Sequence, residues 1–567
     1  MKESLKKNDL VTLSITDLGS SGEGIGKVDG FTLFVKDALI GDRIQAKIIK
    51  VKKSYGYGRL MEILTPSPYR VEARCPQARA CGGCQIQPLA YKKQLSYKEN
   101  KVRELLERVG QVKDYIMEPI IGMEEPWYYR NKAQFPVGQS KEGDIISGFY
   151  AGRTHSIVPV DECFIQHPMN RELMACVRQW MKDYNVSPYN ETTHTGLVRH
   201  IFTRIGKYTG EIMVCLVING KRIPAADALI GVLKNISGMS SICLNINQEK
   251  TNVILGDTVK CLWGKPYITD KIGDVIYQIS PLSFFQVNPV QTQKLYGTAL
   301  EYAGLTGEET VWDLYCGIGT ISLFLAQHAK KVCGVEIVPQ AIEDARENAR
   351  LNHIENAEFF VGKVEEVLPE YYDRYAAEHP GARAHADVIV VDPPRKGCDE
   401  KLLQCMAQMA PDRIVYVSCD PATLARDLKF LEKNGYKVQK VRCTDMFAHS
   451  VHVETIVLLS HKSPDSVINV KVEFGEGEGR VPLDAVAERA KKYHSKPKIT
   501  YKMIQEYVEK KYGLKVHTAY IAEVKRNLGL PMYDAPNMVE ELKQPRRHPT
   551  AEKVEAIKDA LKHFGVI

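Results

Sequence analysis

The chain lacks any long hydrophobic run. No apolar stretch in its 567 residues approaches the ~20 residues that a membrane-spanning helix needs. Its N-terminus, MKESLKKNDL, is charged and lacks the apolar core of a secretion signal. These absences exclude a membrane-spanning protein and predict a cytoplasmic location, with no membrane among its partners.

A strong excess of charge of one sign is also absent. The sequence has 76 basic and 69 acidic residues, and its net charge of +7 is compatible with a polyanionic partner without requiring one. No internal repeat is present. At roughly 150 residues per domain, the length predicts three or four domains.

Fourteen cysteines are present. Without an export signal, they are expected to be thiols, metal ligands or catalytic groups rather than disulfides. Nine stand singly in apolar or mixed segments, where we expect them to pack as small hydrophobes. These nine are Cys176, Cys215, Cys243, Cys261, Cys316, Cys333, Cys398, Cys405 and Cys443. The other five, Cys419 and a cluster of four, need separate explanations.

Residues 1–65 are predicted to form a small β-barrel. Short alternating or β-branched runs, separated by glycine-rich turns, suit five strands closed into a barrel of OB type. One stretch alternates cations with aromatics, as on a nucleic-acid-binding surface or a solvated edge strand. These residues are Lys47, Lys50, Lys52, Lys53, Tyr55, Tyr57 and Arg59. The segment resembles the TRAM domain, an RNA-binding barrel of several RNA-modifying enzymes.

Three further regions follow. Residues 66–285 mix strands with one or two helices, as in a central α+β domain. Residues 286–462 alternate strands and helices, which predicts a doubly wound, Rossmann-like α/β fold with ligands at the carboxyl ends of the strands. Residues 463–567 are a mainly helical extension. Its helix-turn-helix spacing at 499–530 leaves open a nucleic-acid contact or a structural or partner-docking role.

A cofactor site is predicted at the first strand–helix turn of residues 286–462. In VWDLYCGIGT (311–320), Gly317 and Gly319 follow a strand and let the backbone approach a ligand. Glu336 ends the next strand, where an acid can bind a ribose diol. Because the third glycine of a dinucleotide site is missing, S-adenosylmethionine is favoured over NAD.

Two later strand ends carry candidate reacting groups. Asp392 ends a strand in VIVVDPPRKG (388–397). Arg395 follows the two prolines, at a position where methyltransferases that act on exocyclic amines have an aromatic residue, so amine methylation is disfavoured. Cys419 ends the next strand, before a helix whose N-terminal dipole is expected to lower the thiol pKa.

A cysteine at that position suits methylation of uracil at C5. C5 is too weak a nucleophile to attack a sulfonium methyl group, but addition of a thiolate to C6 places negative charge on C5, which then displaces the methyl group. A base must afterwards remove the C5 proton so that the thiolate can leave. Glu454, in HVETIVLL, is the carboxylate that chain order places best for this step.

Five segments resemble successive motifs of the RNA uracil-5-methyltransferase family: SFFQVNPVQTQ, DLYCGIGT, DPPRKG, SCDPATLARD and HVETIVLL. The resemblance extends over roughly residues 5–462. It implies that Cys419 is the nucleophile, that Glu454 is the general base, and that Phe284 contacts a flipped-out base, with Asn288 nearby. The residues implied to line the cofactor and target-base pocket are Gln286, Tyr315, Glu336 and Asp392.

The four clustered cysteines are predicted to bind a metal centre. Cys75, Cys81 and Cys84 form C-x5-C-x2-C, and Cys163 would supply a fourth thiolate. From the residues alone, zinc, an iron–sulfur cluster and a metal-free set of thiols all stay open. In the 23S rRNA branch of the family this spacing binds a 4Fe-4S cluster, so the resemblance implies such a cluster with a structural, RNA-orienting role.

Basic residues in two segments are candidate RNA contacts. Arg130 and Lys132 lie in one segment, and Arg199, His200 and Arg204 lie in the other. They would contact phosphates if they face RNA, or form a solvated surface if they do not. The target uridine must leave its stack, because a cysteine cannot reach C6 in a paired helix.

The sequence thus predicts a monomeric, S-adenosylmethionine-dependent enzyme that forms 5-methyluridine in 23S rRNA. The alternatives are the same chemistry on tRNA, a non-catalytic RNA-binding or ribosome-assembly factor, and a TRAM-bearing radical methylthiotransferase. The cysteine cluster and the barrel argue against tRNA. Intact Cys419 and Glu454 argue against a non-catalytic factor, and the cysteine spacing argues against radical chemistry.

Overall fold

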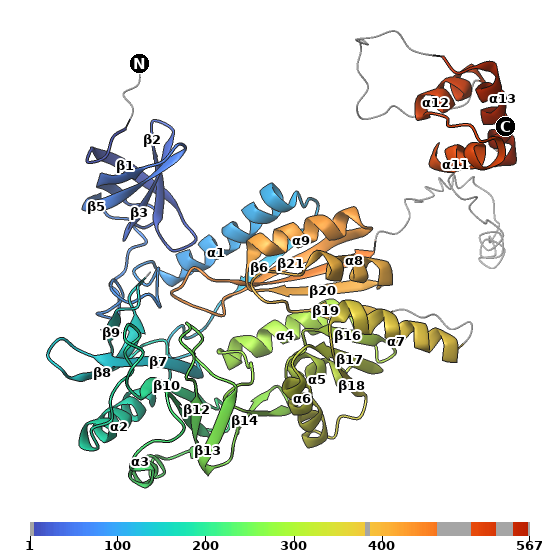
Figure 1. The fold of residues 1–567 in the computed structure, drawn as a ribbon. Helices are drawn as coiled ribbons and strands as arrows, with labels where there is room; N and C mark the ends of the chain where they lie inside the picture. Colours follow the sequence, from blue (N-terminus) through green and yellow to red (C-terminus); the bar gives the residue numbers. More distant parts are fainter. Residues whose placement is uncertain (1–4, 153, 380–385, 462–500, 529–547, 565–567) are drawn as a thin grey trace, which may run out of the picture. The chain divides into compact units, whose positions relative to one another are not determined.

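The computed structural model describes residues 5–152, 154–379, 386–461, 501–528 and 548–564. The chain divides into two units, Met1–Ser466 and Val467–Ile567. Unit 1 contains a closed barrel, two larger sheets and a two-stranded hairpin (Figure 1). Among the described residues, no helix is long and apolar enough to cross a bilayer.

The N-terminal barrel has the five strands that the sequence predicts. They are β1 (Leu10–Leu18), β2 (Gly24–Val28), β3 (Phe31–Lys36), β4 (Arg43–Val51) and β5 (Tyr55–Thr65). They close in the order β1-β2-β3-β5-β4, because β1 pairs with both β2 and β4. Alternate residues fill the interior, and Leu33 and Val35 are fully buried there. Gly56 is also buried, and a Cβ on it would lie 2.9 Å from the Lys50 carbonyl oxygen.

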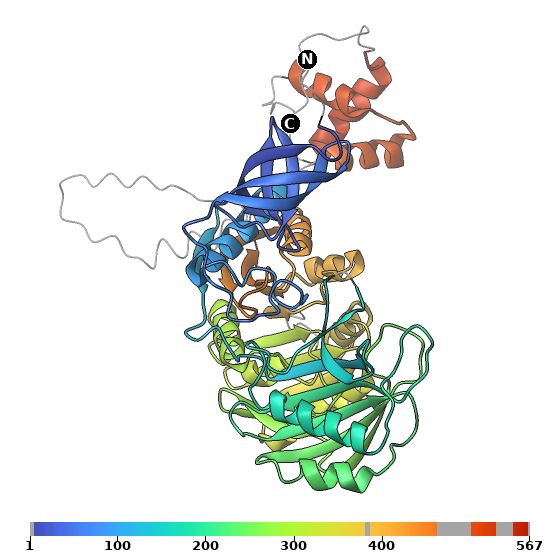
Figure 2. The same ribbon diagram turned by 90° about the vertical axis from the view of Figure 1, so that its left-hand side faces the viewer.

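A seven-stranded sheet follows the barrel. Its strands are β7 (Lys132–Gln139), β8 (Ile145–Tyr150), β9 (Ile157–Pro159), β10 (Val198–Ile205), β11 (Ile212–Ile218), β12 (Met239–Ile246) and β13 (Thr258–Gly264). They are arranged in the order β13-β12-β11-β10-β7-β8-β9. Helices α2 (Asn170–Asp183) and α3 (Ala226–Leu233) lie beside this sheet (Figure 2) and bury apolar side chains against it. A hairpin, β14 (Ile268–Ile272) and β15 (Val275–Ile279), leads into the next region.

The predicted doubly wound α/β fold is confirmed in the last part of unit 1. Its strands are β16 (Thr310–Leu314), β17 (Lys331–Glu336), β18 (Ala357–Val361), β19 (Val388–Val391), β20 (Arg413–Ser418), β21 (Tyr436–Thr444) and β22 (Glu454–His461). The strands from β18 through β17, β16 and β19 to β20 are parallel, and β22 is antiparallel to β20. The chain order reverses between β16 and β19, where such folds bind ligands.

Helices cover both faces of this sheet. One layer contains α4 (Pro289–Ala303), α5 (Thr320–Ala326) and α6 (Pro339–Leu351). The other contains α7 (Val364–Glu378), α8 (Glu400–Met409), α9 (Pro421–Lys433) and α1 (Tyr91–Leu105). The two layers bury alternate side chains of the central strands, so these strands are mostly apolar on both faces, as expected for a parallel sheet buried on both sides.

An eighth strand comes from far earlier in the chain. β6 (Ile116–Ile121) pairs in parallel with β21, and α1 continues through η1 (Leu106–Gly110) to pack against α9. β6 pairs with the edge of β21, which would otherwise present unpaired backbone groups. Residues 91–121, which the sequence pattern assigns to the central region, therefore complete the α/β sheet.

Unit 2 has three helices among its described residues. They are α11 (Tyr501–Tyr512), α12 (Thr518–Asn527) and α13 (Ala551–His563), and they share a small core that includes Val508, Ile521 and Ile557. The expected helix–turn–helix spans α11 and α12. Residues 463–500, 529–547 and 565–567 of the predicted extension lie outside the described residues.

Candidate active site

A cavity of about 810 Å³ lies at the carboxyl edge of the α/β sheet. Residues that follow the parallel strands β16 to β20 line it, together with Glu454, the first residue of β22. Many of the residues singled out in the sequence meet here: Arg130, Phe284, Gln286, Tyr315, Gly317, Glu336, Asp392, Cys419 and Glu454. The fold thus gathers groups from segments that are far apart in the chain.

The turn after β16 forms one wall of the cavity. Tyr315, Gly317 and Gly319 have φ values of 69°, 55° and 80°, so the chain turns sharply into α5 through a left-handed backbone. A Cβ on Gly317 would meet no atom within 4 Å, which leaves room beside the backbone. A Cβ on Gly319 would lie 3.1 Å from the Phe359 ring, so this glycine is needed for packing.

Glu336 is fixed at the end of β17. One of its carboxylate oxygens accepts hydrogen bonds from the backbone N–H groups of Ile337, at 2.8 Å, and Val338, at 3.1 Å. These bonds orient the carboxylate beside the glycine turn. An acid held in this position suits hydrogen bonding to a ribose diol.

Two carboxyl groups, the half-buried Asp392 and the buried Glu454, face the same cavity. Burial raises the pKa of Asp392 to about 7. Burial, followed by the charge of Asp392, raises the pKa of Glu454 to about 8, and Arg395 partly opposes this shift. Glu454 is only 3% exposed. The two groups therefore change protonation near neutral pH, in the range where a general base is most useful.

Cys419 lies between the end of β20 and Asp420, the N-cap of α9. Burial, followed by the charges of Glu454 and Asp392, raises the pKa of its thiol to about 11. The expected lowering by the helix dipole is wrong. The Asp420 carboxylate accepts hydrogen bonds from the first N–H groups of α9, those of Ala422 and Thr423. The thiol is therefore protonated at rest, with two carboxyl groups in its cavity.

The segment before α4 contributes Phe284 and Gln286 to the cavity. Phe284 is 62% exposed at its rim, whereas Gln286 is 7% exposed. Asn288 has a different role. Its side chain caps α4 by accepting a hydrogen bond from the N–H of Gln291 and donates one, at 3.2 Å, to the carbonyl of Met446. Asn288 therefore fastens α4 to the segment after β21.

Two of the candidate RNA contacts lie near this cavity. Arg130 lines it, with its guanidinium 5.9 Å from the centre of the Phe447 ring. Lys132 is half-buried on β7. Burial, followed by the cations Arg204 and Arg130, lowers its pKa to about 8.

The other candidate RNA contacts are corrected by the structure. Arg199 is buried, and its guanidinium donates hydrogen bonds to three backbone carbonyls, those of Asn247, Glu249 and Thr251. Arg204 is also buried and donates to the carbonyl of Ser283 at 2.9 Å. Both guanidinium groups are hydrogen-bonded to backbone carbonyls inside the protein, so neither is positioned to contact an RNA phosphate. Arg199 instead holds the loop of residues 247–251 in place. Charge alone in the sequence did not distinguish these roles.

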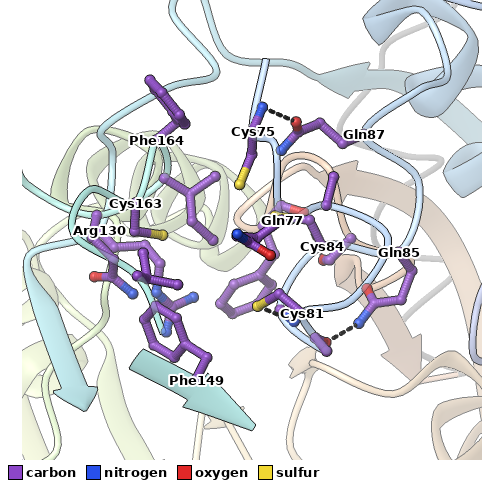
Figure 3. Close-up of a pocket in the computed structure, with 18 of the residues that line it drawn as sticks. Cys75, Gln77, Cys81, Cys84, Gln85, Gln87, Arg130, Phe149, Cys163 and Phe164 are labelled. Carbon is purple, nitrogen blue, oxygen red and sulfur yellow. Dashed lines mark hydrogen bonds between the residues drawn. The ribbon is translucent and has the colours of Figure 1, made fainter. Parts of the chain in front are cut away.

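The four clustered cysteines line a second cavity, of about 350 Å³. Cys75, Cys81 and Cys84 come from one loop and Cys163 from a segment after β9, and several of their sulfur atoms point into the cavity (Figure 3). Burial and the neighbouring thiols raise the pKa of Cys84 to about 12. Among the described residues, no group of three or more His, Cys, Asp or Glu side chains is arranged to hold a metal ion. The four thiols therefore line one cavity, but they are not close enough together to coordinate a metal ion as they stand.

The two cavities share a wall. Arg130, Arg395, Phe447 and His452 line both of them. Phe447 and His452 belong to residues 445–453, which we call the partition loop, between β21 and β22. Glu454, the first residue of β22, follows this loop directly.

Several lining residues have no role assigned by the sequence. Lys363 follows β18, so the strand-end rule that found Asp392 and Cys419 would also have found it. His452 lies two residues before Glu454, on a predicted hairpin. Phe447 sits in a loop with no periodic pattern, and no sequence signal marks it.

Comparisons with known proteins agree with this geometry. Residues 90–462 match the family described as tRNA (Uracil-5-)-methyltransferase, and residues 6–61 match the TRAM domain. An RNA methyltransferase of Halalkalibacterium halodurans is 52% identical over 460 residues, which cover 81% of this chain and 98% of that protein. Another, from Clostridium tetani, is 50% identical over 458 residues, covering 81% and 97%.

One solved structure resembles most of the chain. It is the tRNA (uracil-54, C5)-methyltransferase of Pyrococcus abyssi in complex with S-adenosyl-L-homocysteine. The two chains are 29% identical, with a TM-score of 0.63. The match covers 79% of this chain and 100% of the other.

Proposed function

The chain belongs to the tRNA (uracil-5-)-methyltransferase family, and from this premise we propose that it methylates C5 of a uridine in 23S rRNA. As a member of the family it is an S-adenosylmethionine-dependent RNA (uracil-5-)-methyltransferase with an N-terminal TRAM barrel. The observation that carries the chemistry is the single cavity that Cys419 shares with Glu454 and Asp392. In this proposal the protein acts as a monomer.

The glycine turn and Glu336 fit S-adenosylmethionine. Gly317 leaves backbone open to a ligand, and the fixed carboxylate of Glu336 could accept hydrogen bonds from the ribose hydroxyl groups of the cofactor. Tyr315 and Gln286 would complete this wall. When bound, S-adenosylmethionine supplies a sulfonium methyl group that a carbon nucleophile can accept.

Cys419 and the two carboxyl groups suit the remaining steps. The Sγ atom of Cys419 bonds to C6 of an extruded uracil, and the thiol proton passes to a carboxylate, for which Asp392, with its pKa near 7, is suited. The negative charge that develops on C5 and O4 lies in a cavity also lined by the cation Arg395. After C5 is methylated, Glu454 accepts the C5 proton, the C5–C6 double bond re-forms and the S–C6 bond breaks.

The mouth of the cavity suits a base that has left its stack. Phe284 is exposed at the rim, where its ring can contact an extruded base. Arg130 lines the same cavity and can contact a phosphate or the base. We assign Lys132 to the same RNA-facing region. It is a half-buried cation on β7, and the nearby charge of Arg130 contributes to lowering its pKa.

The proposal includes a 4Fe-4S cluster at Cys75, Cys81, Cys84 and Cys163. Four thiols that line one cavity form the donor set that such a cluster needs, and they would have to move closer to bind it. The cluster would be structural and would orient RNA through the wall shared with the catalytic cavity. Iron and sulfide assays on anaerobically prepared protein test it, and stoichiometric zinc without iron would contradict it.

The identity of the RNA is tested by mapping 5-methyluridine by mass spectrometry in a strain that lacks the gene. We expect the modification to disappear from a position in 23S rRNA. A uridine in tRNA is the second candidate, favoured by the likeness to the Pyrococcus abyssi enzyme. Loss of 5-methyluridine only from tRNA would support that candidate, and unchanged RNA of both kinds would contradict both.

A further inference from the structure

Three aromatic side chains lie together on the outer face of the barrel. Leu33 and Val35 of β3 point into the core, so Phe34 between them points outward. β3 pairs with β5 in a register that sets Phe34 opposite Tyr57. The ring centres of Phe34 and Tyr57 are 5.8 Å apart, and each is 5.7 Å from that of Tyr55. These three residues form what we call the aromatic face.

The three rings pack against one another in two different geometries. Tyr55 meets Phe34 and Tyr57 edge-on, with interplanar angles of 81° and 80°. Phe34 and Tyr57 are tilted by only 37° to each other, so together they form a shallow, continuous surface. All three side chains are partly exposed. A rigid and exposed aromatic surface costs little entropy to use in binding.

A hollow of about 380 Å³ lies over the aromatic face. Its other lining residues are polar and come from the loop between β1 and β2, from β3, and from the turn between β4 and β5. They are Ser20, Ser21, Glu23, Thr32 and Ser54. The hollow therefore combines an aromatic floor with hydrogen-bonding groups at its sides.

Cations flank this hollow. Lys50 of β4 lies opposite Tyr57 in the strand register, and Lys36 of β3 lies opposite Arg59 of β5. All three cationic side chains are exposed. The strand register thus places positive charge beside the aromatic face on two sides.

We infer that the aromatic face is a stacking site for one unpaired nucleobase of the RNA substrate, with Lys50, Lys36 and Arg59 contacting the adjoining phosphates. An aromatic floor between cations suits single-stranded nucleic acid, because every base has a stacking face and every linkage carries a negative charge. A paired helix covers its base faces internally and cannot use such a floor. The inference rests on the proposed function in that it takes the substrate to be RNA.

The test is RNA binding by the full-length protein. The probe is a single-stranded RNA 12-mer that contains 2-aminopurine, whose fluorescence is quenched by stacking. Tyr57→Leu and Phe34→Leu should each weaken binding by about fivefold to about a hundredfold and reduce the quenching, whereas Tyr57→Phe should retain both. Lys50→Ala should weaken binding and lower the slope of log affinity against log salt by about 1.

Thr12→Ala is the matched control. Thr12 is exposed on β1, which is adjacent to neither β3 nor β5 in the barrel, so this change should leave binding and quenching unchanged. Thermal melting of each variant identifies any that fail to fold. If one of Phe34→Leu and Tyr57→Leu does not fold, the other still tests the site. Wild-type affinity and quenching in both folded leucine variants would overturn the inference.

The experiment separates this inference from the proposed function. If both leucine variants bind normally while the wild-type enzyme methylates RNA, the stacking site is wrong and the function stands. If the 12-mer is quenched on the aromatic face but no uridine in 23S rRNA or tRNA is methylated, the proposed function fails and the stacking site stands.

Discussion

Two neighbouring cavities in this protein contain cysteine, and they differ in what surrounds the thiols. In the catalytic cavity Cys419 has two carboxyl groups and an arginine near it. In the second cavity Cys84 lies near three other thiols. Burial raises the pKa of both cysteines, to about 11 for Cys419 and about 12 for Cys84.

The pKa of the resting thiol therefore does not distinguish the proposed nucleophile from the proposed metal ligand. The groups around each thiol do distinguish them. A carboxylate beside Cys419 can accept the thiol proton when a uracil arrives, so the thiolate forms as it reacts. Four thiols without a base can lose their protons together only when a cation replaces them, as in a metal site.

The largest expected difference separates Cys419→Ala from Cys84→Ala. The first removes the bond-forming atom, so methyl transfer should fall by at least about a thousandfold, and the covalent complex with 5-fluorouridine RNA should disappear. The second should lower iron content and still allow the covalent complex in whatever fraction of the protein stays folded. The readouts are methyl incorporation, denaturing gel shift and iron content.

The control for this pair is iron content in Cys419→Ala, which should equal that of the wild type. A covalent complex that persists in Cys419→Ala, or that disappears only in Cys84→Ala, would reverse the two assignments.

Glu454→Gln should affect a later step than Cys419→Ala. The amide cannot accept the C5 proton, so turnover should fall by about a hundredfold to about ten-thousandfold. The addition to C6 does not need this group if Asp392 takes the thiol proton, so ordinary uridine RNA should accumulate as a covalent complex. Denaturing gels of the variant with unmodified RNA measure it. A variant that turns over slowly without accumulating the complex would place the base elsewhere.

The sequence could predict the positions of site residues only where the fold follows from the local alternation of strands and helices. Strand–helix alternation placed Asp392 and Cys419 at strand ends, and the α/β rule brought both into one cavity. The direction of the Cys419 pKa shift depends on burial of the thiol, on the nearby carboxyl groups and on capping by Asp420. Those depend on long-range packing, so the helix-dipole argument failed.

Long-range pairing also explains the other differences. β6 joins β21 across more than three hundred residues of chain, and no local pattern encodes that pairing. The sequence predicts Arg199 as an RNA contact because it does not show which acceptors a cationic side chain on a strand will bind. Its partners are carbonyls in residues 247–251, a loop that the sequence does not place beside it.

The wall between the cavities gives the third prediction. Lys98 of α1 is fully buried, forms a 2.6 Å ion pair with Asp445 and donates to the carbonyl of Phe447 at 2.9 Å. Lys98→Met would leave the Asp445 charge buried and unpaired, which costs about 3–5 kcal/mol of stability. Because the partition loop forms one side of both cavities, covalent complex formation and iron content should fall together. Thermal melting and both assays measure this.

Lys101→Met is the matched control for Lys98→Met. Lys101 lies on the same helix and donates one hydrogen bond, at 3.0 Å, to the carbonyl of Val451 in the same loop. Its loss should cost only about 1 kcal/mol. Adding Asp445→Asn to Lys98→Met should restore part of the lost stability. If Lys98→Met lowers only one of the two activities, the cavities do not depend on a common wall.

The smallest expected effect is a pH dependence of kcat/KM that arises from the catalytic cavity and not from the cysteine cavity. The pKa values of Asp392 and Glu454 are raised to about 7 and about 8. In the proposed mechanism both groups accept protons. As pH falls below these values the carboxylates are protonated, so kcat/KM should fall by about tenfold per pH unit at first and more steeply below both. As pH rises above about 8 it should level off. Iron content measured in parallel should stay constant where kcat/KM changes.

Asp392→Asn tests whether the pH dependence of kcat/KM arises from Asp392 and Glu454 together. The charge of Asp392 contributes to the raised pKa of Glu454, so its removal should shift the remaining limb of the kcat/KM profile to lower pH, while the maximal rate falls because one proton acceptor is lost. A limb that stays in place, or moves to higher pH, would mean that the two carboxyl groups do not interact. A profile that follows the loss of iron would assign the pH dependence to the cysteine cavity instead.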